Sequence, residues 1–291
     1  MRRLLLLAAI ARACDGSRGA ALAAALRKPP GTPAVLVRLN CADLRADTSD
    51  ADGDLAAMSE RLREAGVDAL ILRGASEAQA RAVIEEQRMA ASSYPGPCPV
   101  LLQPSTWPVT GGLAPDLNDE LAALVLPEGA AEADAPADAA LASSLQLVPQ
   151  VWSVDELRQC SGRAPLAILT PAFSSALLDA EAEAAGAVAA HDGAVVAALP
   201  PGLEAASRRA RALRAAGCAG VLIDDDAAVG QPEVAVREVL SKASEAFGSY
   251  GLKMGFSSFM SDQYWLNKDI KEAKRSVARQ RNERGEPPLE L

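Results

Sequence analysis

Short runs of apolar residues alternate with longer helical patterns along most of this 291-residue chain. The first run, residues 34–39, is rich in Val and Leu, and a helical pattern follows over residues 55–65. The next run is residues 68–72, and a second helical pattern covers residues 76–89, with Glu77 in its first turn. Such alternation predicts strand–helix–strand units around a parallel sheet.

Further apolar runs extend the pattern, at residues 99–103, 122–126, 145–151, 165–169, 194–199 and 220–223. Eight strands, each followed by a helix or a helix-length gap, favour a closed (β/α)8 TIM barrel over residues 33–246. An open, doubly wound sheet is the alternative. That fold favours a glycine-rich phosphate loop after the first strand, whereas residues 40–43 read Asn-Cys-Ala-Asp.

One type of helix-to-strand joint occurs twice, around Gly66 and Gly217. At both places an alanine-rich helical pattern ends at the glycine and an apolar run begins two or three residues later. Glycine after a helix is typical of a left-handed C-terminal cap. The two joints are therefore predicted to be loops that lead from a helix into the next strand of the barrel.

Composition indicates a globular protein with an aliphatic core. The chain is 49% hydrophobic and 23% charged, and its net charge of -9 argues against nucleic-acid binding by the whole surface. Aromatic residues make up only 3% of the chain, and six of the ten lie within residues 247–265. The predicted barrel must therefore be filled mainly by Leu, Val, Ile and Ala.

Cysteine and histidine usage excludes several kinds of site. His191 is the only histidine, which excludes a multi-histidine metal centre, and its Asp192-Gly193 neighbours favour a loop. The cysteines are odd in number and never in CxxC spacing, which predicts neither a disulfide framework nor a zinc site and favours a reducing compartment. They are Cys14, Cys41, Cys98, Cys160 and Cys218.

Four segments carry a resemblance to a known family. A helical segment, 23–29, leads to Ala-Val-Leu-Val-Arg at 34–38, and residues 99–104 read Pro-Val-Leu-Leu-Gln-Pro. Residues 147–152 are followed by an acidic helix start at 154–157, and the run 219–223 is followed by Gly-Gln-Pro-Glu at 230–233. In order and spacing these segments resemble indole-3-glycerol-phosphate synthase, a TIM barrel. The resemblance implies an added N-terminal helix and a functional site at the barrel mouth.

The family's catalytic residues are missing at the matching positions. Of the residues that the resemblance places at the mouth, the polar groups kept are Arg38, Gln103 and Gln150, which we interpret as vestigial. No lysine lies between Lys28 and Lys242, so the barrel has no lysine to act as a general acid or Schiff-base nucleophile. Arginine cannot replace it, because a guanidinium stays protonated near neutral pH. We expect no catalytic residue and no cofactor.

A phosphate site and a metal site are both doubtful predictions for the mouth. After the last two strands Gly202 and Gly230 could donate N–H groups to a phosphate, but Pro200 and Pro201 donate none. Three aspartates would repel a phosphate. They either cap a turn and face solvent, or bind Mg²⁺ or Ca²⁺ with help from Asp43 or Asp47. They are Asp224, Asp225 and Asp226.

The N-terminal segment, residues 1–32, has two interpretations. Its charged start, short apolar run and Ala-Arg-Ala sequence are typical of a signal peptide, but the helical pattern continues to Arg27 and Lys28 before Pro29. We favour an amphipathic pair of helices or the remnant of an organelle-targeting sequence. The apolar run is too short to span a bilayer, so no transmembrane span is predicted.

The C-terminal segment, residues 247–291, differs from the barrel in composition. Aromatic residues come first, and residues 268–284 then hold seven basic and three acidic residues. The segment could fold back on the barrel, dock on a protein partner or, less favoured, bind nucleic acid. We favour the protein partner, bound by Phe256, Phe259, Tyr264, Trp265, Lys268, Lys271, Lys274 and Arg275.

Two functions stay open on the sequence. The first is a non-catalytic barrel that serves as a scaffold or accessory subunit of a protein assembly through its C-terminal arm. The alternative is a TIM-barrel lyase or phosphate-sugar enzyme with altered, metal-assisted chemistry. Heavy use of Ala and Arg with few Lys is typical of a GC-rich genome, and with the N-terminal segment it predicts a chloroplast location, with the cytoplasm as the alternative.

Overall fold

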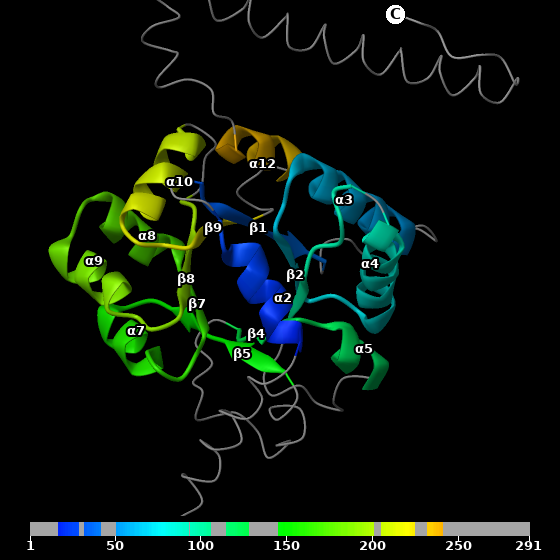
Figure 1. The fold of residues 1–291 in the computed structure, drawn as a ribbon, viewed down its shortest axis with the longest axis horizontal. Coiled ribbons are helices and arrows are strands. Elements are labelled where there is room, and N and C mark those ends of the chain that lie inside the picture. The colour runs from blue at the N-terminus through cyan, green and yellow to red at the C-terminus, as the bar shows by residue number, and fades with distance from the viewer. Residues whose placement is uncertain are drawn as a thin grey trace, which may run out of the picture. The chain divides into compact units, whose positions relative to one another are not determined.

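The strands form one parallel sheet. The computed structural model describes residues 17–28, 32–41, 51–92, 94–105, 115–127, 145–200, 205–224 and 232–240. Within them the strand order is β5-β4-β3-β2-β1-β9-β8-β7-β6 (Figure 1). The strands are β1 (Ala34–Asn40), β2 (Ala69–Arg73), β3 (Val100–Gln103), β4 (Ala123–Val125), β5 (Gln146–Val148), β6 (Gln150–Val151), β7 (Leu166–Leu169), β8 (Ala194–Ala198) and β9 (Gly220–Asp224).

The two ends of this strand order are neighbours in the chain, so the sheet closes on itself. Only Pro149 separates β5, which pairs with β4, from β6, which pairs with β7. Pro149 has no N–H to donate, but its carbonyl accepts from Ile168 at 3.0 Å and continues the ladder. The predicted (β/α)8 barrel is confirmed, with the run 145–151 split into two short strands.

Helices surround this closed sheet (Figure 1). No helix in the described ranges is both long and apolar enough to cross a membrane. The helices are α2 (Ser17–Leu26), α3 (Ala51–Ala65), α4 (Glu77–Met89) with the 3-10 turn η1 (Ala90–Ser92), α5 (Pro115–Glu120), α7 (Val154–Cys160), α8 (Pro171–Leu178), α9 (Ala182–Ala189), α10 (Ala206–Ala215) and α12 (Pro232–Leu240).

Local signals place the helix ends. Ser76 and Gln79 form a capping box at the start of α4: the Ser76 hydroxyl accepts from the Gln79 N–H at 3.2 Å, and the Gln79 side chain accepts from the Ser76 N–H at 2.9 Å. Gly66 and Gly217 follow α3 and α10 with φ of 101° and 102°. Both predicted joints are thus confirmed as left-handed glycine caps that lead into β2 and β9.

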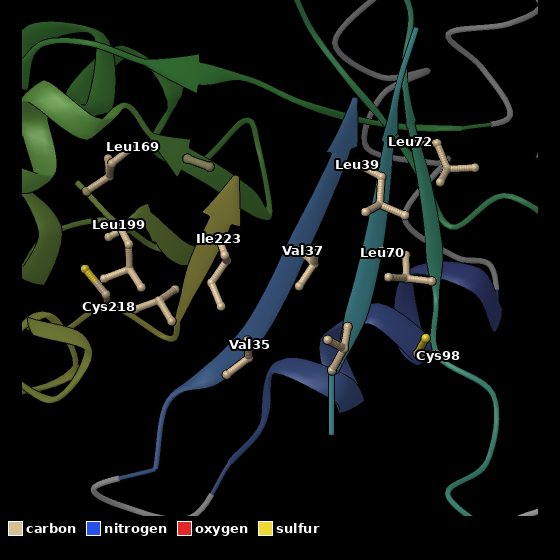
Figure 2. Packing of buried hydrophobic residues seen from close by; sticks show 14 of the residues in the cluster. Val35, Val37, Leu39, Leu70, Leu72, Cys98, Leu169, Leu199, Cys218 and Ile223 are labelled. Carbon is tan, nitrogen blue, oxygen red and sulfur yellow. The ribbon is translucent and has the colours of Figure 1, made fainter. Parts of the chain in front are cut away.

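Alternation along each strand divides the apolar residues into two layers. Leu36, Ile71 and Leu222 pack together inside the barrel. Val35 and Val37 belong to the outer layer, between strands and helices, part of which Figure 2 shows. Because both faces of the sheet are buried, the strands read as continuous apolar runs in the sequence, as in other all-parallel sheets.

Helix α2 covers the N-terminal end of the barrel. Its Leu22 and Leu26 are 1% and 6% exposed and pack against the interior layer, and Figure 1 shows the helix lying among the strands. Lys28, just after the helix, forms an ion pair with Asp68, whose carboxylate also accepts from the Val35 N–H at 2.9 Å. The predicted N-terminal helix is confirmed over Ser17–Leu26.

A buried polar network joins α3 to α4. Glu86 accepts from Arg63 Nε at 3.1 Å, from the Ser59 hydroxyl at 2.6 Å and from the Gln87 amide at 2.6 Å. Gln87 in turn accepts from the Cys98 N–H at 2.7 Å, just before β3. Arg63 and Glu86 side chains are only 7% and 14% exposed. The network therefore fixes two helices and the entry to a strand.

Two buried thiols should resist alkylation. Cys98 and Cys218 lie in the outer layer, and desolvation by burial raises the pKa of each to about 12. Relative to an ordinary thiol this leaves about 1,000-fold less thiolate at pH 8. We expect iodoacetamide at pH 8, followed by peptide mass spectrometry, to label both only after denaturation, whereas half-buried Cys160 is labelled in the native protein. Native labelling of Cys218 at the rate of Cys160 would contradict the prediction.

Candidate functional site

Four polar residues lie toward the carboxyl ends of different strands. Arg38 lies near the end of β1, Gln103 ends β3, Asp224 ends β9, and Gln150 lies in the two-residue β6 that ends the segment 146–151. Because all strands of the barrel run parallel, their carboxyl ends meet at one mouth, where TIM-barrel active sites are built. Arg38 follows Leu36 on the inward-facing positions of β1. The three residues predicted for the mouth are therefore brought together, and Asp224 joins them.

Arg38 is the centre of this mouth network, defined by Arg38, Gln103, Gln150 and Asp224. Its Nε donates to Asp224 Oδ1 at 2.6 Å, and its Nη2 forms an ion pair with Asp224 Oδ2. Its Nη1 donates to Gln150 Oε1 at 2.9 Å and to Gln103 Oε1 at 3.3 Å. Gln150 then donates to the Leu126 carbonyl at 2.7 Å. The fork of Arg38 thus binds one carboxylate bidentately and two amides at once.

Burial makes this network a closed unit. Arg38 is 4% exposed and Gln103 2%, whereas the Asp224 side chain is 19% exposed. A charge removed from water needs a partner. Here the two charges compensate each other, and the guanidinium also donates to the oxygens of Gln103 and Gln150. Neither a guanidinium nor an amide transfers protons near neutral pH. The network can hold strands together and fill the mouth, but its only carboxylate is already bound to Arg38.

Thr170 carries a buried polar atom outside this network. It continues β7 beyond Leu169 and caps α8, with φ of -66° and ψ of 162°. Strand alternation places its side chain on the inward side, like that of Ile168. Thr170 is 7% exposed, yet its Oγ1 has no hydrogen-bond partner among the residues that the structure describes. A buried hydroxyl without a partner is uncommon in folded proteins, so the Thr170 hydroxyl is a candidate to hydrogen-bond with a ligand.

His191 lies at the opposite end of the barrel. It occupies the predicted loop, between α9 and β8, and its Nδ1 accepts from the Gly193 N–H at 2.9 Å. It is 8% exposed, and desolvation lowers its pKa despite the opposing effect of Asp192. The lone histidine therefore takes no part in the mouth network and shapes the turn into β8.

Other candidate residues lie outside the described residues. Among the residues that are described, no cluster of three or more His, Cys, Asp or Glu side chains could hold a metal ion. The metal and phosphate predictions at the mouth, and partner binding by the C-terminal segment, stay predictions. The residues concerned are Asp43, Asp47, Gly202, Asp225, Asp226, Gly230, Phe256, Phe259, Tyr264, Trp265, Lys268, Lys271, Lys274 and Arg275.

Comparisons with known proteins give a likeness of fold alone. No family model and no curated protein matches the chain. Thiamine phosphate pyrophosphorylase from Bacteroides thetaiotaomicron is 14% identical, with a TM-score of 0.42 over 72% of this chain and 94% of that one. Dihydropteroate synthase from Xanthomonas albilineans is 14% identical, with a TM-score of 0.44 over 75% and 96%. An HpcH/HpaI aldolase from Desulfitobacterium hafniense is 11% identical, with a TM-score of 0.41 over 74% and 95%.

Proposed function

We propose that this chain is a non-catalytic barrel, similar to indole-3-glycerol-phosphate synthase, that serves as a scaffold or accessory subunit of a protein assembly. The mouth network carries the proposal. Its one carboxylate is bound by Arg38, and its two amides complete the bonding of the same guanidinium. Because these side chains are hydrogen-bonded to one another, they support the barrel, and none of them is free to exchange a proton with a substrate.

In this proposal the C-terminal segment, residues 247–291, makes the contact with the assembly. Tyr and Trp next to a basic stretch supply the residue types that dominate protein–protein contacts. The net charge of -9 for the whole chain weighs against nucleic acid as the partner. We propose a chloroplast location for this assembly, on the composition and the N-terminal segment.

Partner capture tests the scaffold proposal. We expect the double substitution Tyr264→Ala/Trp265→Ala in the full chain to weaken partner capture from native extract roughly 30-fold or more, the loss typical of interface anchors. The matched control is Tyr94→Ala, because Tyr94 is fully exposed on the barrel and away from this segment in sequence. A chain that ends at Leu252 and still captures every partner would overturn the docking role.

A second candidate, a metal-assisted barrel enzyme, is supported by the buried hydroxyl of Thr170, which lacks a hydrogen-bond partner among the described residues. Its carboxylates would be Asp225 and Asp226, since Asp224 is bound to Arg38. Thermal unfolding with and without Mg²⁺, in the full chain and in Asp225→Asn/Asp226→Asn, distinguishes the candidates. A Mg²⁺-dependent rise in Tm that the double variant loses, or turnover of the synthase's carboxyphenylamino-deoxyribulose phosphate substrate, would favour the enzyme over the scaffold.

A further inference from the structure

A pocket of about 570 Å³ lies at the base of the barrel, at the end opposite the mouth. It lies between α2 and the loops that lead into β7 and β8, and its lining includes Leu22 of α2 and Leu166 of β7. Ligand sites commonly measure 300–1,000 Å³ and have mainly apolar walls. The size of this basal pocket therefore suits a small molecule.

Apolar side chains form the inner wall of the basal pocket. Leu22, Leu26 and Leu166 are 1%, 6% and 1% exposed, and Ala194 and Ala219 complete this wall. These leucines are largely covered by the interior layer, so half-buried Ala194 and Ala219 and exposed Ala23 supply much of the apolar surface that a ligand would contact. An alkyl chain placed there would exchange water for contacts with aliphatic side chains, which is favourable for each methylene buried.

Charged side chains line the rest of the pocket. Arg27 follows α2 and Arg163 lies in the turn after α7, and both are exposed. Neither guanidinium forms an ion pair or a side-chain hydrogen bond with any residue that the structure describes. Asp192 also lines the pocket, but its carboxylate lies 3.5 Å from the Ser161 hydroxyl and its N–H donates to the same hydroxyl at 3.3 Å. A hydroxyl does not neutralise a carboxylate, so the two guanidinium groups and this one carboxylate leave the lining with a net charge of +1.

The wall that α2 contributes is firmly held. Arg214 of α10 donates to the Cys218 carbonyl at 3.0 Å and to the Lys28 carbonyl at 3.4 Å. Lys28 is also paired with Asp68 on the segment before β2. Two elements thus fix the chain directly after the helix, so the pocket exists before any ligand binds, which lowers the entropic cost of binding.

We propose that the basal pocket binds an amphipathic monocarboxylate with a medium-length alkyl chain. The alkyl chain lies against Leu22, Leu26 and Leu166, and the carboxylate is bound by Arg27 and Arg163. Bidentate pairing with arginine is the preferred recognition of a carboxylate. The binding is non-covalent, and it is independent of the scaffold role, since it uses neither the mouth nor residues 247–291.

Calorimetric titration of the full chain with hexanoate, octanoate and decanoate, each kept below its micelle-forming concentration, tests the proposal. We expect saturable binding of one equivalent, with affinity rising roughly threefold to fourfold for each added methylene until the pocket is full. The alcohols of equal length should bind at least about threefold more weakly, because they lack the charge that the arginines recognise.

Substitutions on α2 identify the site. Ala23 and Ala24 are adjacent and both exposed, but only Ala23 lines the pocket. We expect Ala23→Trp to weaken decanoate binding tenfold or more by filling the space, while the control Ala24→Trp leaves it unchanged. Arg163→Gln should weaken decanoate but not decanol. Both tryptophan variants are first checked for the wild-type Tm, since their side chains start at exposed positions.

Three results would overturn the proposal. They are the absence of saturable binding for every acid, an equal loss of binding in Ala24→Trp and Ala23→Trp, and equal affinity for decanol and decanoate. None of them affects partner capture by the C-terminal segment. Equally, failure of the capture experiment would leave the titration result standing, so the two proposals fail separately.

Discussion

Replacing Arg38 with methionine should lower the free energy of unfolding by about 3–5 kcal/mol, because the substitution leaves the Asp224 carboxylate in a mostly buried site without its cation. Gln103 and Gln150 also lose the guanidinium to which their side-chain oxygens are bonded. In a domain of this size the expected fall in Tm is roughly 6–20 °C. Urea unfolding followed by circular dichroism measures the change.

Two further variants separate loss of the charge pair from loss of packing. Arg38→Met/Asp224→Leu removes both charges and should recover more than half of the lost stability, since no uncompensated charge remains. Arg81→Met removes an exposed partner of Glu77 on α4 and should change the unfolding free energy by less than about 0.5 kcal/mol. A double variant no more stable than Arg38→Met would show that the ion pair is not what the arginine contributes.

The fold could be predicted because the strands of a parallel barrel leave a recognisable pattern in the sequence. Strands such as β1 and β2 are buried on both faces, so they appear as unbroken apolar runs in the sequence. The glycine caps at Gly66 and Gly217 mark where β2 and β9 begin. The run 145–151 was predicted as one strand. Its division follows from Pro149, which lacks an N–H and interrupts pairing where the segment changes from one neighbour to the other.

The candidate site could be predicted only in part. The resemblance to indole-3-glycerol-phosphate synthase predicts Arg38, Gln103 and Gln150 at the mouth, and the structure brings their side chains together. The pairing of Arg38 with Asp224 was not foreseen, since three adjacent aspartates look alike in sequence and only the register of β1 against β9 places Asp224 beside Arg38. The basal pocket was missed for a similar reason. Its walls come from α2, β7 and two loops, and no sequence pattern brings these together.

The two ends of the barrel differ in which charged and polar side chains lack a partner. At the mouth, Arg38 hydrogen-bonds to the side chains of Gln103, Gln150 and Asp224. Among the described residues, Thr170 Oγ1 and Oε2 of Glu233, in the first turn of the helix that follows β9, are buried without a hydrogen-bond partner. At the base, an apolar helix covers the interior while two arginines line an open pocket. These two arginines, which form no ion pair with a described residue, therefore lie at the base, whereas the charges of the mouth network are paired with each other.

Replacing Glu86 with alanine should lower the free energy of unfolding by about 3 kcal/mol or more. The carboxylate pairs with Arg63, whose side chain is 7% exposed, and also accepts from Ser59 and Gln87. Its loss leaves a buried guanidinium uncompensated and removes an acceptor from two further donors. Because Gln87 also accepts from the Cys98 N–H, we expect hydrogen exchange of the Cys98 amide to quicken as well, as native-state exchange with mass spectrometry would show.

Glu85 offers a matched control one residue away on α4. It pairs with Arg88 on the exposed face, so Glu85→Ala should cost less than about 0.5 kcal/mol and leave exchange at Cys98 unchanged. Arg63→Met/Glu86→Leu removes both charges and should be more stable than Glu86→Ala. Similar losses in Glu85→Ala and Glu86→Ala would mean that α4 responds to any change of charge, and that the network between α3 and α4 has no special weight in stability.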